Sequence, residues 1–391
     1  MLVYSYGQKY HHHQLSLTVL VIFYDKIIEF HPLVLFTSTI IPSYVYTYIK
    51  IDFLKKLIIG EENLLRLKKF ENIKDLIEFI SPYYPEVIIK EYTIVEIEQA
   101  LFHVYIKLIG RILSFSPENM RIFLRALLLK FEISNIKQII LGSIIGMLKT
   151  QKSKRINFLV EEYLEHSNFI NDLLEISNLD EIQLFMKRTR YNKIIREGLL
   201  YFKNTKEIFV LEAFLDKFYY ENLLLTKPIY NKKEATMISL FSDYSTEVYN
   251  LRMISRAIIN NFDKNLVAQL LINEFVFLDS NKINTLLNTN NIDDFISNLE
   301  NFLRSSKELK ELFIPIILNK NHLRWSFEGL YQNYFFKKFQ LIIDDFDYAT
   351  IYKILELIIK KEREIKFYIM PNVIRLIHDK YERLKLSDEN F

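Results

Sequence analysis

The chain has 391 residues, half of them hydrophobic, so it can bury a large core and form two or three structural units. Its 51 basic and 48 acidic side chains leave a formal net charge of +3 and alternate along the chain, which argues against a nucleic-acid-binding surface. There is no cysteine, which excludes disulfides, thiolate metal sites and thiol nucleophiles and is typical of proteins in a reducing cytoplasm.

Residues 1–42 contain two apolar runs, 15–24 and 33–41, which Asp25, Lys26 and Glu29 keep apart. Neither run reaches the roughly 18 to 20 residues that a membrane-spanning helix needs. No small-residue cleavage site follows them, so a secretory signal is also a poor fit. We interpret residues 1–42 as a dispensable extension, consistent with a start codon placed too early, and its three adjacent histidines as flexible rather than metal-binding.

From residue 43 onward, apolar residues recur at three- and four-residue steps, which is the spacing of one helix face. The clearest stripes lie at 94–112 and 351–358, and sustained alternation of period two is hard to find. Only 7 glycines and 8 prolines occur in the chain, as expected for long helices joined by short connectors. The sequence therefore predicts an all-α fold.

Three short signatures each occur three times, in the same order. The first is a helix start, in which an asparagine is followed three residues later by an acid: Asn72, Asn178 and Asn291. An asparagine at this position can accept a hydrogen bond from the free amides of the first turn, and the acid favours the positive end of the helix dipole. We predict a helix beginning after each of these asparagines.

The second signature is an acid followed by apolar residues at helical spacing, at Glu98, Glu212 and Glu328. The third is a polar residue followed by a base and an isoleucine, at Asn135, Asn250 and the degenerate Glu364. Asn135 and Asn250 are 115 residues apart, and Asn250 and Glu364 are 114 apart. This period is too long for an ordinary solenoid repeat, so we predict three tandem helical bundles packed around a common axis.

These signatures favour a structural role, because a functional site would more naturally belong to one unit. We expect Asn135, Asn250 and Glu364 to fix helix ends or interhelical hydrogen bonds. Gly142 and Gly146 indicate close helix packing. The predicted domains are 1–42 (extension), 43–150, 151–262 and 263–385 (three repeats) and 386–391 (tail), with seams at 149–155 and 260–265. We interpret Lys152, Lys154 and Arg155 as a solvated linker in preference to a binding patch.

No catalytic motif is present in the sequence. We find no nucleotide-binding G-x-x-x-x-G-K-[ST] or G-x-G-x-x-G, no H-E-x-x-H and no G-x-S-x-G. His103 and His378 are best interpreted as ordinary packed or surface residues. We therefore predict a protein that is not an enzyme and has no cofactor and no metal site.

The residues match a family pattern. The stretch 98–140, with Ser116-Pro117, Arg121 and Arg125, resembles the first repeat of the A-type/V-type ATPase C subunit, whose equivalent in vacuolar enzymes is the d subunit. Residues 189–191, 215–220 and 249–257 resemble the second repeat, and 361–366 the C-terminal signature. The resemblance runs from about residue 43 to about 385. No single motif is specific, and the order and threefold repetition carry the resemblance.

The resemblance implies a funnel-shaped, non-catalytic central-stalk subunit of a proton- or sodium-translocating rotary ATPase. Such a protein couples the rotor shaft to the membrane proteolipid ring and is peripheral to the cytoplasmic face of the membrane. Four arginines are candidate partner contacts, although a solvated or salt-bridged face is the simpler interpretation: Arg121, Arg125, Arg252 and Arg256. The alternatives are a helical-repeat adaptor that binds soluble partners and an unrecognised helical enzyme.

Overall fold

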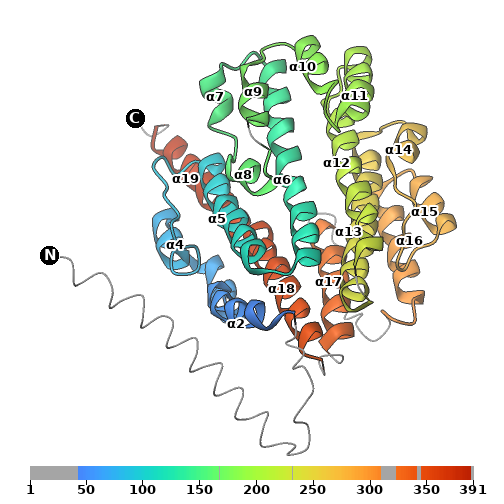
Figure 1. The fold of residues 1–391 in the computed structure, drawn as a ribbon. Coiled ribbons are helices and arrows are strands. Elements are labelled where there is room, and N and C mark those ends of the chain that lie inside the picture. Colours follow the sequence, from blue (N-terminus) through green and yellow to red (C-terminus); the bar gives the residue numbers. More distant parts are fainter. Residues whose placement is uncertain (1–42, 167, 231, 310–322, 341–344, 389–391) are drawn as a thin grey trace, which may run out of the picture. The chain divides into compact units, whose positions relative to one another are not determined.

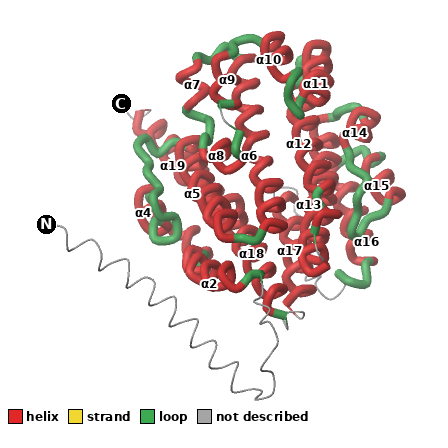
Figure 2. Tube along the Cα trace, in the orientation of Figure 1, coloured by secondary structure: helices red, strands yellow, loops and turns green. Residues whose placement is uncertain are grey.

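The computed structural model describes residues 43–388 except 167, 231, 310–322 and 341–344. Its contacts divide the chain after Pro42, and Ser43–Phe391 forms one compact unit. The predicted extension and its histidines lie outside the described residues. Within those residues every regular element is a helix and no strand occurs (Figure 2). The all-α prediction is therefore confirmed.

The same order of elements occurs three times: a group of short helices, then two long ones (Figure 1). The first group is α2 (Val45–Leu54), α3 (Glu61–Arg66), α4 (Ile73–Ile80), and the long pair α5 (Ile94–Phe115) and α6 (Glu118–Ile144). The second is α7 (Lys149–Ser153), α8 (Leu159–Leu164), α9 (Phe169–Glu175), α10 (Leu179–Met186), α11 (Asn192–Thr205), and the long pair α12 (Ile208–Leu225) and α13 (Lys232–Asn260). The third is α14 (Lys264–Leu270), α15 (Ser280–Leu287), α16 (Ile292–Ser305), and the long pair α17 (Leu323–Gln340) and α18 (Phe346–Arg363).

After α18 the chain continues through a π-helical turn, η5 (Glu364–Ile369), into α19 (Met370–Asp388). The long helices α6, α12 and α13 run side by side in the middle of Figure 1. The stripes predicted at 94–112 and 351–358 form buried faces of α5 and α18. The helices α6 and α12 bury more than one apolar row, because each lies among neighbours on several sides. Leu101 and Leu215, at equivalent positions of α5 and α12, are fully buried.

Asparagines cap one short helix in each group. Asn72 accepts a hydrogen bond from the Lys74 amide at the start of α4, and Asn178 accepts one from the Glu181 amide at the start of α10. Asn291 accepts from the Asp294 amide at the start of α16. Each cap satisfies a first-turn amide that has no partner inside its own helix.

Two asparagines on the long helices hold the segment that follows in the next group. Asn135 of α6 donates to the carbonyl of Asn157 (2.9 Å) and accepts from its amide (3.0 Å). Asn250 of α13 does the same with the backbone of Ile272, at 2.7 and 2.9 Å. In both cases the partner lies 22 residues further along the chain. A primary amide matches a backbone amide in both directions, and we call each such contact an inter-repeat clamp.

The third clamp closes the arrangement, because it holds a segment of the first group. Glu364 accepts from the Ile59 amide (2.7 Å) and from the Tyr84 hydroxyl (3.0 Å). Lys361, one turn earlier, donates to the carbonyls of Leu57 (2.6 Å) and Tyr83 (3.1 Å) and pairs with Glu364. The end of the third repeat thus binds the start of the first, and α2 also packs on α18.

Two expectations for the end of α6 and the segment that follows it are wrong. Lys152 is not part of a solvated linker: it lies in α7, is buried against Gly142, and donates to the Ile176 carbonyl at 2.8 Å. Gly146 does not serve helix packing, because a Cβ there would meet nothing within 4 Å. Its φ of 71° ends α6 in the left-handed conformation that glycine adopts without steric cost. Gly142 is the packing glycine.

We expect Asn250→Ala to destabilise the protein by about 3 kcal/mol, because it leaves the buried amide and carbonyl of Ile272 without partners. The measurement is the shift of the urea unfolding midpoint. Asn72→Ala is the matched control, since it removes only an exposed helix cap and should cost about 1 kcal/mol. Equal losses in the two variants would contradict a special role for the clamp.

The buried pair Lys361–Glu364 should behave differently from the amide clamps. Burial lowers the pKa of Lys361 to about 8 and raises the pKa of Glu364, so both groups carry a desolvation cost. Lys361→Met and Glu364→Gln should each cost about 3 kcal/mol or more, because each leaves one buried charge unpaired. The double variant should lose at least about 2 kcal/mol less than the sum of the singles. Strictly additive losses in a double-mutant cycle would show that the two charges are not coupled.

Candidate functional site

All six long helices contribute to one small cavity, which we call the central cavity. Its volume is about 50 Å³, and its walls combine aliphatic side chains with aromatic and polar ones. The tyrosines and the charged and amide residues among them are Tyr105 of α5, Lys130 of α6, Tyr219 and Tyr220 of α12, Tyr244 and Arg252 of α13, Glu328 and Gln332 of α17, and Glu362 of α18. Burial raises the pKa values of the tyrosines, so their hydroxyls remain protonated.

Two sets of ion pairs lie at the central cavity. The Glu362 carboxylate forms an ion pair with the Lys130 ammonium, with 2.5 Å between Oε1 and Nζ, and a second ion pair with Lys366. Burial alone would raise the pKa of Glu362, but the two lysine charges lower it overall, so the carboxylate stays ionised. Burial lowers the pKa of Lys366 to about 7 despite the attraction of Glu362, and the positive charge of Lys130 lowers it further. Arg252 and Glu328 form the second pair.

The cavity offers hydrogen-bonding groups that the described residues do not use. The Oε1 atom of Gln332, a side chain more than nine-tenths buried, has no hydrogen-bond partner in that part of the chain. The Nε atom of Arg252 likewise has no hydrogen-bond partner among the described residues. Buried polar atoms are usually paired, so this cavity presents an acceptor and a donor to a polar guest group.

Two buried acids lie one turn before the clamp asparagines. Glu132 of α6 contacts His166 at 2.6 Å and also binds Arg190 and Tyr191. Glu247 of α13 accepts from the backbone amides of 276–278 and from Tyr331. Neither acid is among the site residues predicted from the sequence, although the repeated spacing Glu-x-x-Asn at 132–135 and 247–250 was a signal that could have found them.

The signature acids predicted from the sequence lie in three different surroundings. Glu212 of α12 is 3.8 Å from Arg256, and Glu328 of α17 pairs with Arg252 at the central cavity. Glu98 of α5 is exposed and lines a larger groove in the first repeat. The structure therefore places these acids on equivalent helices without bringing them together in one site.

The four arginines are likewise not gathered in one place. Arg121 and Arg125, in the first turns of α6, contact Glu118 at 3.5 and 3.9 Å, and Arg125 also contacts Glu165 at 2.6 Å. Arg256 lies over the ring of Phe209, with 4.3 Å between the guanidinium carbon and the ring centroid. Of the four, Arg252 is the one that lines the central cavity.

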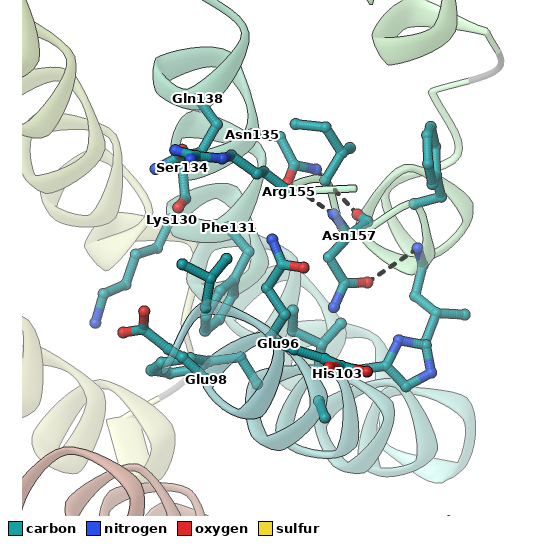
Figure 3. Close-up of a pocket in the computed structure, with 18 of the residues that line it drawn as sticks. Glu96, Glu98, His103, Lys130, Phe131, Ser134, Asn135, Gln138, Arg155 and Asn157 are labelled. Carbon is teal, nitrogen blue, oxygen red and sulfur yellow. Dashed lines mark hydrogen bonds between the residues drawn. The ribbon is translucent and has the colours of Figure 1, made fainter. Parts of the chain in front are cut away.

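The larger groove lies between α5, α6 and the segment 155–159, and we call it the repeat-1 groove (Figure 3). Its volume is about 830 Å³. Figure 3 shows Glu98 and Lys130 at one part of its wall and Ser134, Gln138 and Arg155 at another, and Lys366 also lines the groove. Lys130 and Phe131 line both the groove and the central cavity, so the two hollows adjoin.

Metal-binding clusters and membrane-spanning helices are both absent from the described residues. No group of three or more His, Cys, Asp or Glu side chains in them is arranged to hold a metal ion. None of their helices is both long and apolar enough to cross a membrane.

The family model for the ATP synthase (C/AC39) subunit matches residues 50–367. That range begins in α2, ends in η5, and includes all three long helix pairs and all three clamps. The chain belongs to the ATP synthase C/AC39 subunit family. The resemblance seen in the sequence is thereby confirmed.

Relatives in this family are distant in sequence. The C subunit of the A-type ATP synthase of Methanocaldococcus jannaschii is 25% identical over 297 residues, which cover 74% of this chain and 70% of the relative. The same subunit of Methanosphaera stadtmanae is 22% identical over 261 residues, 66% of each chain. That of Methanobrevibacter smithii is 20% identical over 185 residues, 47% of each. The chain thus spans about two thirds of the length of the first two relatives.

Stability should depend on pH through Glu132. Burial alone would raise the pKa of this carboxyl, but His166, Arg190 and Tyr191 lower it overall. A lowered folded-state pKa means that the stabilisation is present above the unfolded-state pKa of about 4.3 and is lost as the pH falls through the folded-state value. Glu132→Gln should therefore lower the free energy of unfolding by about 3 kcal/mol at pH 7. The difference in unfolding free energy between this variant and the parent chain should become smaller below about pH 4.

Urea unfolding midpoints at about pH 7 and about pH 3.5, on either side of the unfolded-state pKa, measure this effect. Glu118→Gln is the control, because Glu118 is an exposed surface acid and its loss should change the midpoint little at either pH. If the difference in urea midpoint between the parent chain and Glu132→Gln is the same at both pH values, the Glu132 carboxylate does not stabilise the fold through its ionisation.

Proposed function

We propose that this chain is a non-catalytic central-stalk subunit of an A-type/V-type rotary ATPase, which couples the rotor shaft to the membrane proteolipid ring. The observation that carries the proposal is the family match over 50–367, which spans the three repeats. In this role the chain works mechanically, and ATP chemistry and ion passage belong to other subunits.

The construction of the chain supports a mechanical role. A coupler must transmit torque without deforming, and close-packed interiors resist compression. Here the three repeats are tied to one another by buried clamps, the last of which returns to the first repeat. Aromatic pairs reinforce the same core, including Tyr244 with Phe241 and Phe335.

The central cavity supports a contact with a partner at the meeting point of the long helices. It combines tyrosine rings with two ion-pair sets and with the unused polar atoms of Gln332 and Arg252. Aromatic residues and arginine are enriched where proteins bind one another. We propose that the foot of the rotor shaft contacts the chain around the mouth of this cavity, with Arg252 as one of the contacts.

The chain should reach the membrane through its partners. We propose that it lies at the cytoplasmic face, peripheral to the membrane and seated on the proteolipid ring. The arginines Arg121, Arg125 and Arg256 are already engaged by acids of the same chain. Arg252 also pairs with Glu328, but it alone of the four lines the central cavity and keeps an Nε atom without a hydrogen-bond partner among the described residues, so we rank it first as a contact with the shaft or the ring.

Co-purification tests the proposal. The full chain, carrying an affinity tag, is recovered from native membranes in a mild detergent, and the accompanying proteins are identified and quantified by mass spectrometry. We expect proteolipid-ring and rotor-shaft subunits in stoichiometric amounts. A set of soluble partners without any ATPase subunit would support a helical adaptor instead and would overturn the coupler role.

Coupling itself can be measured in membrane vesicles. Depletion of the chain should leave ATP hydrolysis by the catalytic head largely intact while ATP-driven ion uptake falls to background, because torque no longer reaches the ring. Adding the purified chain back should restore uptake. Ion uptake that survives complete depletion would show that the chain is not the coupler.

A further inference from the structure

The repeat-1 groove occupies a position that, beside the long helices of the second repeat, is filled by α14, the helix that follows α13. For this comparison the short helix that follows each long pair is taken together with that pair, so α7 goes with the first repeat and α14 with the second. The offset between the repeats is fixed by the signatures: Glu98 corresponds to Glu212, and Asn135 to Asn250. The clamps extend this correspondence to Asn157 and Ile272. Side chains of the two repeats can therefore be compared position by position.

In the second repeat, helix α14 packs on both α12 and α13 and closes an apolar cluster. Leu266 and Leu270 of α14 are buried in it together with residues of the two long helices. Phe262, just before α14, stacks on Phe209 with 4.4 Å between ring centroids. The members from the long helices are Phe209, Val210 and Ala213 of α12 and Tyr249 and Met253 of α13.

The corresponding positions of the first repeat line the repeat-1 groove and are mostly polar. On α5, the residues that correspond to Phe209, Val210 and Ala213 are Val95, Glu96 and Gln99. On α6, those that correspond to Tyr249 and Met253 are Ser134 and Gln138. The residue that corresponds to Leu270 is Arg155. The corresponding short helix, α7, packs on α6 and α9. The groove thus stays open where the second repeat is closed.

The lining has an apolar part and an uncommitted polar part. Phe102, Phe131 and Ile156 supply the first. Gln99, Gln138 and Arg155 supply the second, and no hydrogen bond or ion pair joins their side chains to another described residue. Glu96 is already engaged, since it accepts from the amides of Lys90 and Glu91 at 2.7 Å each. Arg155 therefore gives the groove an available cation.

We propose that the repeat-1 groove is a docking site for a short amphipathic helix of another subunit of the same ATPase. This helix takes the place that α14 has in the second repeat. It lays apolar residues against Phe102 and Phe131 and presents a carboxylate to Arg155. A helix laid in a groove is a common mode of recognition between proteins, and an arginine can bind a carboxylate through two parallel hydrogen bonds. The inference rests on the proposed function, because it takes the guest from the same complex.

Site-directed photo-cross-linking in the native complex tests the inference. A photoreactive amino acid replaces the exposed Ser134 in the full chain, and the complex is recovered from membranes, illuminated and digested. We expect a cross-link to one ATPase subunit, at a segment with apolar residues at helical spacing and at least one acid. Arg155→Leu, which installs the residue of the second repeat, should lower the yield about tenfold, while Arg155→Lys should lower it less.

A second variant replaces polar groups of the groove with the second repeat's own apolar residues. Gln99→Ala combined with Gln138→Met should also lower the yield from position 134, while thermal unfolding stays within a few degrees of the parent chain. A chain that co-purifies with ATPase subunits but gives no cross-link from position 134 would overturn this inference and leave the coupler role intact. A cross-link yield from position 134 that Arg155→Leu leaves unchanged would also overturn the inference. A chain that recovers no ATPase subunits would overturn both.

Discussion

The fold depends on one kind of contact, in which a polar side chain on the second long helix of a repeat binds the backbone of the next short-helix group. Asn135 and Asn250 make it with two hydrogen bonds each. An irregular segment cannot be buried unless its amides and carbonyls find partners. The clamps supply those partners, so the connections between repeats can lie against the core and hold successive repeats in register.

The third clamp uses charge where the other two use an amide. Lys361 and Glu364 bind Leu57, Ile59 and Tyr83, which precede them by about 280 to 305 residues. A buried ion pair contributes less net stability than its geometry suggests, but the loss of one partner is costly. The closure between the last and first repeats therefore depends on two charges that must be kept together, and it is the one clamp with groups that titrate in an accessible pH range.

The repeats have diverged in how each fills the space beside its long helices. The second repeat seals that space with α14, whose leucines join an apolar cluster. The first repeat has a serine, two glutamines and an arginine at positions of that cluster and retains an open groove. The first two repeats share their long helices and amide clamps, so this difference lies in the lining and in the packing of α7 and α14. A shared scaffold with different linings allows one chain to combine a rigid core with separate contact surfaces.

The sequence by itself determined the helical class, the threefold repetition, the capping asparagines and the family. These follow from local rules, since helical periodicity and caps depend on residues within a few positions of each other. Only the tertiary structure decided that Lys152 is buried, that Glu132 gathers His166 and Arg190, and that Lys361 and Glu364 reach back to the first repeat. It alone placed Lys130 beside Glu362 at the central cavity. Such pairs join residues tens to hundreds of positions apart, and no spacing along the chain records which distant segments packing will bring into contact.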